Sequence, residues 1–530
     1  MEDIRNMQRI HSNHFINKLI EAANWVISVT GSVIFAVLIG FSLIHTQYMI
    51  PGGSETPLNR SDSLLSNVSV LVLVLLLIFF LYRAEKKMPE NIKRILARVS
   101  VIIAMLWTAV VGFWWITTVN RIPEGDQAYL YGGASYFLEG QYVFLEKGGY
   151  LDMCPHQLNL VFLMELLFLV VGTYNYFAFQ VICVLSTVGI VLLGYLLIRQ
   201  MTDKSMPTIT YCILIACCLP MFFYTGWVYG DIPSVFWVLA AANLLAAYEK
   251  KKRWGYLIGI VISLVLAIMV RQNSLIFLIA LCLAGFVHFL KTMDRKLLVT
   301  LVLAIACPLL ITAGVNKMYE LRSGIPHSNG MSSYSYIAMG LQEQNGMCGW
   351  HSLYCKEVYY AADYDSDLAG EISKQDIRNR MAEFAADPIY TVQFFGKKIL
   401  TQWNAPLYQC LFFSNRYAEG TEPASDSLVA KISNEFFDDV LEFCNYLQLI
   451  IYVGTFCYFL FAVKKDSNTI RHFVAICILG GFFFTIIWEA KSRYTLPYYL
   501  LMFPLAVIGY QCFFEWSIAR FLDSPIRKQI

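Results

Sequence analysis

Residues 99–119 read VSVIIAMLWTAVVGFWWITTV, and the chain continues as NRIPEGDQAYLYGGASYF over residues 120–137. The first stretch has no charged side chain, and its length matches the roughly 20 residues that an α-helix needs to cross a bilayer. In the second stretch, Asp126 is the only acid between Gly125 and Gly133. Together they predict a membrane-spanning helix that delivers a carboxylate to one membrane surface.

The same apolar pattern recurs along the whole chain. Of the 530 residues, 57% are hydrophobic and only 15% are charged, whereas about a quarter of the residues in a soluble globular chain are charged. The apolar blocks lie near 24–48, 64–82, 99–119, 174–198, 207–228, 232–248, 254–270, 273–290, 297–315, 441–463, 471–488 and 495–516. We therefore expect an all-α polytopic membrane protein with about 12–13 transmembrane helices.

Lysine and arginine predict which loops face the cytoplasm, because cytoplasmic loops carry an excess of both. They cluster in short loops, as Arg83, Lys86, Lys87, Lys93, Arg94, Arg199, Lys204, Lys250, Lys251, Lys252, Arg253, Lys291, Arg295, Lys296, Lys464, Lys465 and Arg471. These loops fall on one side only if the shorter block 157–172, which carries Glu165, does not cross. We favour twelve spans with both ends inside and a surface or re-entrant element at 157–172; a thirteenth span is the alternative.

This topology divides the chain into four regions. Residues 1–98 hold an N-terminal cytoplasmic segment and two helices, and 99–315 form a transmembrane module whose first outer loop is 120–156. Residues 316–440 form an extracytoplasmic loop region with surface helices, and 441–530 hold the last transmembrane helices and a cytoplasmic tail. The net charge of +2 gives no indication of a nucleic-acid partner.

The outer region 316–440 contains two predicted helices. The first is the amphipathic segment DSDLAGEISKQDIRNRMAEFAAD, and the second begins with Asp387 as its N-cap and Pro388 at its first position. The second helix is expected to lie along the membrane surface, because apolar residues recur on one face at helical spacing. These residues are Val392, Phe395, Ile399 and Trp403.

Charged residues from four outer segments are expected to meet near one membrane surface. They are Asp126, Asp231 in YGD, Arg271 in MVRQN, and Glu489, Lys491 and Arg493 in WEAKSRYTLP. Each has a second interpretation as an interfacial anchor at a helix end. Cys348 and Cys355 lie in a polar outer segment, where a disulfide and two free thiols are equally open predictions.

Several familiar chemistries have no motif in the sequence. There is no GxxxxGK[ST] phosphate loop, no GxSxG nucleophile elbow and no HExxH zinc motif. The outer histidines His156, His327 and His351 have no metal-ligand spacing. We therefore expect neither ATP-driven transport nor a bound cofactor, and a loosely bound divalent cation is left open.

The order of these motifs resembles a known family. The early Asp126 is followed by GGASYFLEGQY at 132–142, by CPHQLNLVFLMELL at 154–167, by YGD at 229–231 and by an ExKxRYxxP pattern at 489–497. Over residues 99–516 this order is similar to the GT-C superfamily of integral-membrane glycosyltransferases, which includes protein O-mannosyltransferases, aminoarabinose transferases and GPI mannosyltransferases. The resemblance is closest to uncharacterised bacterial members.

The resemblance implies transfer of a sugar, with inversion, from a polyprenyl-phosphate donor to a glycan, lipid or protein acceptor. It implies Asp126 as the general base, a role that suits a carboxylate near the acceptor hydroxyl. It further implies Arg271 and Arg493 on the leaving phosphate, with Lys491 assisting. The other substrate-binding residues that it implies are Asp231, His156, Glu489 and Tyr494.

Two other functions remain open at this stage. A transporter or flippase of lipid-linked sugars should place charges near the bilayer midplane, whereas the charges here gather at one outer edge. A non-catalytic polymer-assembly protein is the third possibility. For the transferase, we expect a multi-pass protein of the cell membrane, in contact with membrane lipids, whose active site faces outward.

Overall fold

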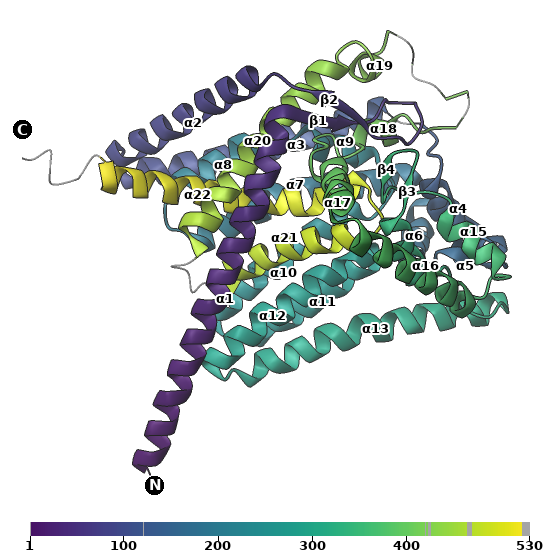
Figure 1. Ribbon diagram of the computed structural model, residues 1–530, viewed down its shortest axis with the longest axis horizontal. Helices are drawn as coiled ribbons and strands as arrows, with labels where there is room; N and C mark the ends of the chain where they lie inside the picture. The colour runs from purple at the N-terminus through teal and green to yellow at the C-terminus, as the bar shows by residue number, and fades with distance from the viewer. Residues whose placement is uncertain are drawn as a thin grey trace, which may run out of the picture.

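The computed structural model describes residues 2–119, 121–418, 420–421, 424, 426–463 and 469–521. The chain is 79% helical with almost no sheet in these residues, which confirms the predicted all-α polytopic membrane protein. The long helices run side by side, and short helices cover one end of the bundle, on the right in Figure 1.

Ten helices among the described residues are long and apolar enough to cross a membrane. They are α1 (Glu2–Ile44), α2 (Leu64–Lys87), α3 (Glu90–Thr118), α7 (Tyr176–Met201), α10 (Asp231–Lys251), α12 (Leu275–Thr292), α13 (Arg295–Ser323), α20 (Phe437–Phe461), α21 (Thr469–Ile487) and α22 (Leu496–Phe521). Each coincides with a predicted block.

The two remaining predicted blocks form irregular helices. The block 207–228 is split into α8 (Met206–Ala216), α9 (Leu219–Phe223) and the 3₁₀ turn η3 (Tyr224–Gly226), with a 57° bend. The bend comes just before Pro220, the second residue of α9, because a proline ring cannot continue the preceding helix. The block 254–270 is α11 (Trp254–Val270), whose 17 residues are close to the minimum for a span.

The segment 157–172 belongs to a chain that turns sharply. Elements η1 (Val143–Leu145) and α5 (Tyr150–Met153) meet η2 (Pro155–Gln157) and α6 (Leu158–Val171) at 102°. The Glu165 carboxylate is 2.7 Å from Arg322 Nη1 and accepts a 2.6 Å hydrogen bond from Tyr319. Beyond the end of α6, the Tyr174 amide donates to Ser135 in α4 (Asp126–Leu138). These contacts hold the middle of α6 and the residues after its C-terminal end beside the last turns of α13 and beside α4, which favours the surface or re-entrant prediction.

The first predicted block ends differently from expectation. Helix α1 ends at Ile44, and the last residues of block 24–48 form strand β1 (His45–Tyr48), which pairs antiparallel with β2 (Leu58–Ser61). The strand leaves the helix path because the Gln47 amide donates to the Asn404 carbonyl, 2.9 Å away. The two N-terminal helices therefore carry a small hairpin at their junction.

The predicted outer region is a cluster of short elements. It contains α14 (Ser333–Leu341), β3 (Glu343–Gln344), β4 (Met347–Cys348), α15 (Tyr354–Ala361), α16 (Ser366–Ala386), α17 (Pro388–Trp403), α18 (Cys410–Ser414) and α19 (Leu428–Ser433). The predicted cap at Asp387 is confirmed, because its carboxylate accepts from the Tyr390 amide at 2.9 Å. Cys348 and Cys355 are both free thiols, so the disulfide alternative is wrong.

Helix α17 turns polar as well as apolar side chains toward the protein. Val392 is 74% exposed, and the side that faces the protein is formed by Phe394, Lys398 and Gln402. The Lys398 ammonium is buried and donates to the Gly340 carbonyl, and burial lowers its pKa to about 7. A hydropathy pattern does not indicate a buried lysine, and the predicted position of this helix along the membrane surface stays a prediction.

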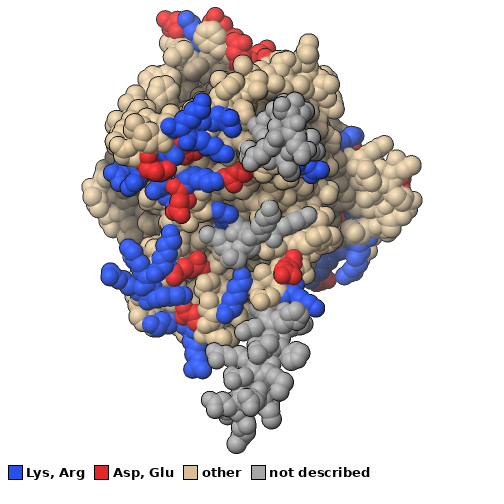
Figure 2. Space-filling view, turned by 90° about the vertical axis from the view of Figure 1, so that its left-hand side faces the viewer, with Lys and Arg blue, Asp and Glu red and all other residues tan. Residues whose placement is uncertain are grey.

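Basic side chains gather at the end of the bundle opposite the short helices. Figure 2 shows Lys and Arg on the face that forms the left-hand side of Figure 1. Helix α2 ends with Lys86 and Lys87, and α10 ends with Lys250 and Lys251. Lys464 and Lys465, predicted on the same side, lie outside the described residues.

Candidate functional site

One cavity of about 460 Å³ lies at the end of the bundle covered by the short helices. This size is within the range of small-molecule sites in proteins. Seven of the eight predicted site residues line it, namely Asp126, His156, Arg271, Glu489, Lys491, Arg493 and Tyr494. The structure thus gathers three of the predicted segments, 120–156, 271–272 and 489–494, which are far apart in the sequence.

Asp126 is the first residue of α4, directly after Gly125, which occupies the N-cap position. Its side chain is 40% exposed to the cavity, and its Oδ2 lies 3.5 Å from Arg493 Nη2. Gly125 has a φ of +65°, a conformation that favours glycine, and this turn starts the helix at the cavity wall. The carboxylate therefore faces both the open space and a cation.

Arg493 comes from η6 (Ser492–Thr495), the turn that precedes α22. Its side chain is only 5% exposed, and its guanidinium lies 5.3–6.0 Å from the centres of four aromatic rings. These rings belong to Trp227, Tyr229, Phe413 and Tyr494. Its Nε has no hydrogen-bond partner among the described residues. A buried donor without a partner is costly, so this group is suited to an anionic ligand.

Arg271 and Asp231 form a buried ion pair between two helix ends. Arg271 Nε is 3.3 Å from Asp231 Oδ1, and the side chains are 10% and 2% exposed. Gly230 makes this approach possible, because a Cβ there would lie 1.7 Å from the Val270 carbonyl oxygen. Arg271 lines the main cavity, but Asp231 lies behind it and does not. Asp231 positions Arg271 through this ion pair, and its predicted substrate-binding role stays a prediction.

Glu489 and Lys491 lie on the connection between α21 and η6. The buried Glu489 carboxylate accepts from Tyr494 and lies 2.8 Å from His351 Nδ1. Burial raises the pKa of Glu489, but hydrogen bonding to His351 and the charge of Lys491 lower this pKa to about 2. Glu489 is thus a fixed anion that orients its neighbours. The His156 ring lies beside Gln157 Nε2 at 3.2 Å, on the same cavity wall.

Two cavity residues that pair with predicted site residues were themselves not predicted from the sequence. His351 was treated as an isolated histidine, and Glu55, in the loop between β1 and β2, was not considered. Glu55 Oε1 lies 2.9 Å from Lys491 Nζ. The predicted topology already places the loop after the first span outside, so that position was the available signal. The pairing itself joins residues more than 400 positions apart and leaves no local pattern.

The described part of the chain holds no group of three or more His, Cys, Asp or Glu side chains that could bind a metal ion. Five Lys and Arg residues line the cavity. Three of them lie beside a carboxylate: Arg493 with Asp126, Arg271 with Asp231, and Lys491 with Glu55. Such an arrangement can bind an anionic group while a carboxylate stays available as a base. Comparison with protein-family models and with curated proteins found no match for the chain.

Proposed function

We propose that this protein is a membrane glycosyltransferase that moves a sugar from a polyprenyl-phosphate donor to an acceptor outside the cell membrane. The observation that carries the proposal is the pairing of the cavity-facing Asp126 with the buried Arg493. A displacement at the anomeric carbon needs a base on the acceptor side and fixed positive charge on the leaving phosphate. The resemblance in the motifs of the outer loops supports the same assignment.

In the proposed reaction, the acceptor hydroxyl attacks the anomeric carbon and forms a new C–O bond. Its proton moves to the Asp126 carboxylate, and the bond between the anomeric carbon and the phosphate oxygen breaks with inversion. The phosphate leaves with the electron pair. Arg493 and Arg271 stabilise its charge, because a guanidinium binds two phosphate oxygens at once.

The location of the cavity supports a lipid donor. Helix α10 runs from Asp231, the ion-pair partner of the cavity residue Arg271, to Lys250 and Lys251 at the basic end of the bundle. Under the positive-inside rule, the cavity then faces outward. A polyprenyl chain can remain in the bilayer while its phosphate and sugar enter from the side.

A flippase of lipid-linked sugars is the second candidate, and it predicts a different result. The test uses purified protein, a radiolabelled short-chain polyprenyl-phosphate sugar, and separate glycan, lipid and peptide acceptors. Release of polyprenyl phosphate together with a labelled acceptor supports the transferase. Binding of the donor with no C–O bond cleavage under any acceptor, combined with donor movement across vesicles, would replace it with the flippase.

A further inference from the structure

The N-terminal hairpin places a carboxylate inside the cavity of the proposed site. Glu55 lies between β1 and β2, and its Oε1 is 2.9 Å from Lys491 Nζ. The Lys491 side chain is only 6% exposed and that of Glu55 is 20% exposed. The two N-terminal helices lie outside the region of family resemblance, so this carboxylate is an addition to the site.

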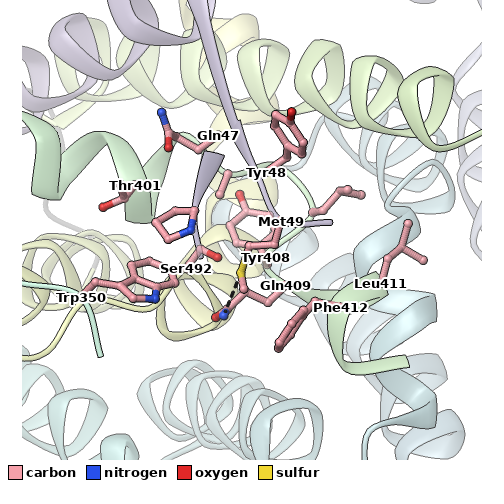
Figure 3. A pocket seen from close by; sticks show the side chains of 13 residues that line it. Gln47, Tyr48, Met49, Trp350, Thr401, Tyr408, Gln409, Leu411, Phe412 and Ser492 are labelled. Carbon is pink, nitrogen blue, oxygen red and sulfur yellow. Dashed lines mark hydrogen bonds between the residues drawn. The ribbon is translucent and has the colours of Figure 1, made fainter. Parts of the chain in front are cut away.

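The loop that carries Glu55 is held firmly. Trp350 Nε1 donates to the Glu55 carbonyl at 3.0 Å, and Gln409 Nε2 donates to the Glu55 carboxylate at 3.2 Å. Figure 3 shows Gln409 beside Met49, where the two side chains are in contact. The space between these elements is about 10 Å³, room for about one water molecule. The hairpin therefore fits closely against the rest of the protein.

Helix packing supports the same fixed position. The N-terminal helix α1 contacts α20 through Phe35 and Phe459, whose rings are 5.6 Å apart. The Ser28 hydroxyl donates to the Phe459 carbonyl at 2.7 Å. Because both the helix and the hairpin are anchored, Glu55 keeps its place when a ligand enters.

Glu55 is an anion in this position. Burial raises the pKa of the Glu55 carboxyl, but the charges of Lys491 and His351 hold this pKa below its usual value. Any phosphate that reaches Lys491 must therefore compete with a carboxylate already bound there. The extent to which Glu55 weakens phosphate binding depends on how much negative charge the phosphate carries.

The proposed reaction changes that charge. The donor is a phosphodiester with one negative charge, and the lipid product is a phosphate monoester with about −1.5 to −2 at pH 7. A fixed carboxylate repels the product more than the donor. We propose, resting on the proposed transferase function, that Glu55 is a positioning residue that holds Lys491 and weakens binding of the dianionic lipid product, so that the product leaves after transfer.

The test compares two lipids, polyprenyl phosphate and its methyl ester, which keeps a single negative charge. We expect the wild-type protein to bind polyprenyl phosphate, which is the monoester, no more tightly than its methyl ester. In Glu55→Gln, the monoester should gain about tenfold in affinity over the methyl ester, because one repelling charge is lost. The turnover number and the KM for the donor should then both fall, because product release becomes slow.

The matched control is Asp438→Asn, which removes the exposed carboxylate paired with Arg60 of the same hairpin at 3.3 Å. It should leave the ratio of the two affinities unchanged. If the ratio of the two affinities in Glu55→Gln equals the wild-type ratio, the inference is overturned. The inference is also overturned if the wild-type protein binds the monoester more than tenfold tighter than the methyl ester, and this second outcome does not require the variant to fold. A wild-type protein that binds neither lipid would remove the proposed function itself.

Discussion

Replacing Asp126 by asparagine keeps the shape of the side chain and removes its ability to accept a proton. The carboxylate is 40% exposed and 3.5 Å from Arg493, so loss of this ion pair should cost less than about 1 kcal/mol of folding stability. Positioned acid–base catalysis contributes about 10²–10⁴-fold in rate. A loss of about 100-fold corresponds to about 2.7 kcal/mol of barrier, which exceeds the expected change in stability.

The assay measures transfer from a synthetic polyprenyl-phosphate sugar by purified Asp126→Asn, together with donor binding and thermal unfolding. We expect at least about a 100-fold lower rate, with donor binding equal to or tighter than wild type, because Arg493 loses its competing anion. Asp363→Asn is the control. Asp363 does not line the cavity, and its carboxylate forms an exposed ion pair with Lys147 at a distance of 3.0 Å. Near-normal transfer by Asp126→Asn would show that Asp126 is not the base.

Three further predictions concern the cation pair, acid stability and topology. Arg271→Ala should destabilise folding by about 3–5 kcal/mol, because Asp231 stays buried without its partner; adding Asp231→Asn should restore folding in a detergent melt but not transfer. The pKa of Glu489 lies at about 2 against an ordinary 4.5, so its contribution is full above pH 4.5 and is lost as pH falls towards 2; Glu489→Gln should flatten the melting temperature over this window. In a cysteine-free background, a cysteine at Asp363 should react with an impermeant reagent on intact cells and one at Lys251 should not; equal labelling would refute the topology.

Composition and charge placement were sufficient to predict the helices and their order. Spans such as 99–119 are set by a local balance, because a long apolar run has no alternative to a helix in a bilayer. The charge pattern also grouped Asp126, Arg271 and Arg493 at one end of the bundle, where they line a single cavity. These features depend on neighbouring residues and on the direction of the chain.

The contacts within the site could not be predicted in this way. Asp231 and Glu55 are both carboxylates near a predicted outer surface, yet one lies behind Arg271 and the other pairs with Lys491 inside the cavity. Nothing in the sequence near Lys398 indicates that this lysine is buried, and its hydrogen bond to the Gly340 carbonyl compensates for burial. Such choices depend on distant segments that pack together, which periodicity does not contain.

The contact at Gly230 determines how the cavity responds to its ligand. The start of α10 touches the end of α11 through main-chain atoms, so the separation of the two helix ends is set without any long side chain. Arg271 is thus held rigidly at these helix ends, and binding of the proposed phosphate ligand should require little reorganisation. A receptor assembled in advance recognises a headgroup by itself. Short water-soluble phosphate esters of the sugar in the proposed donor should then occupy the cavity. The lipid tail of the full donor should add residence time and local concentration.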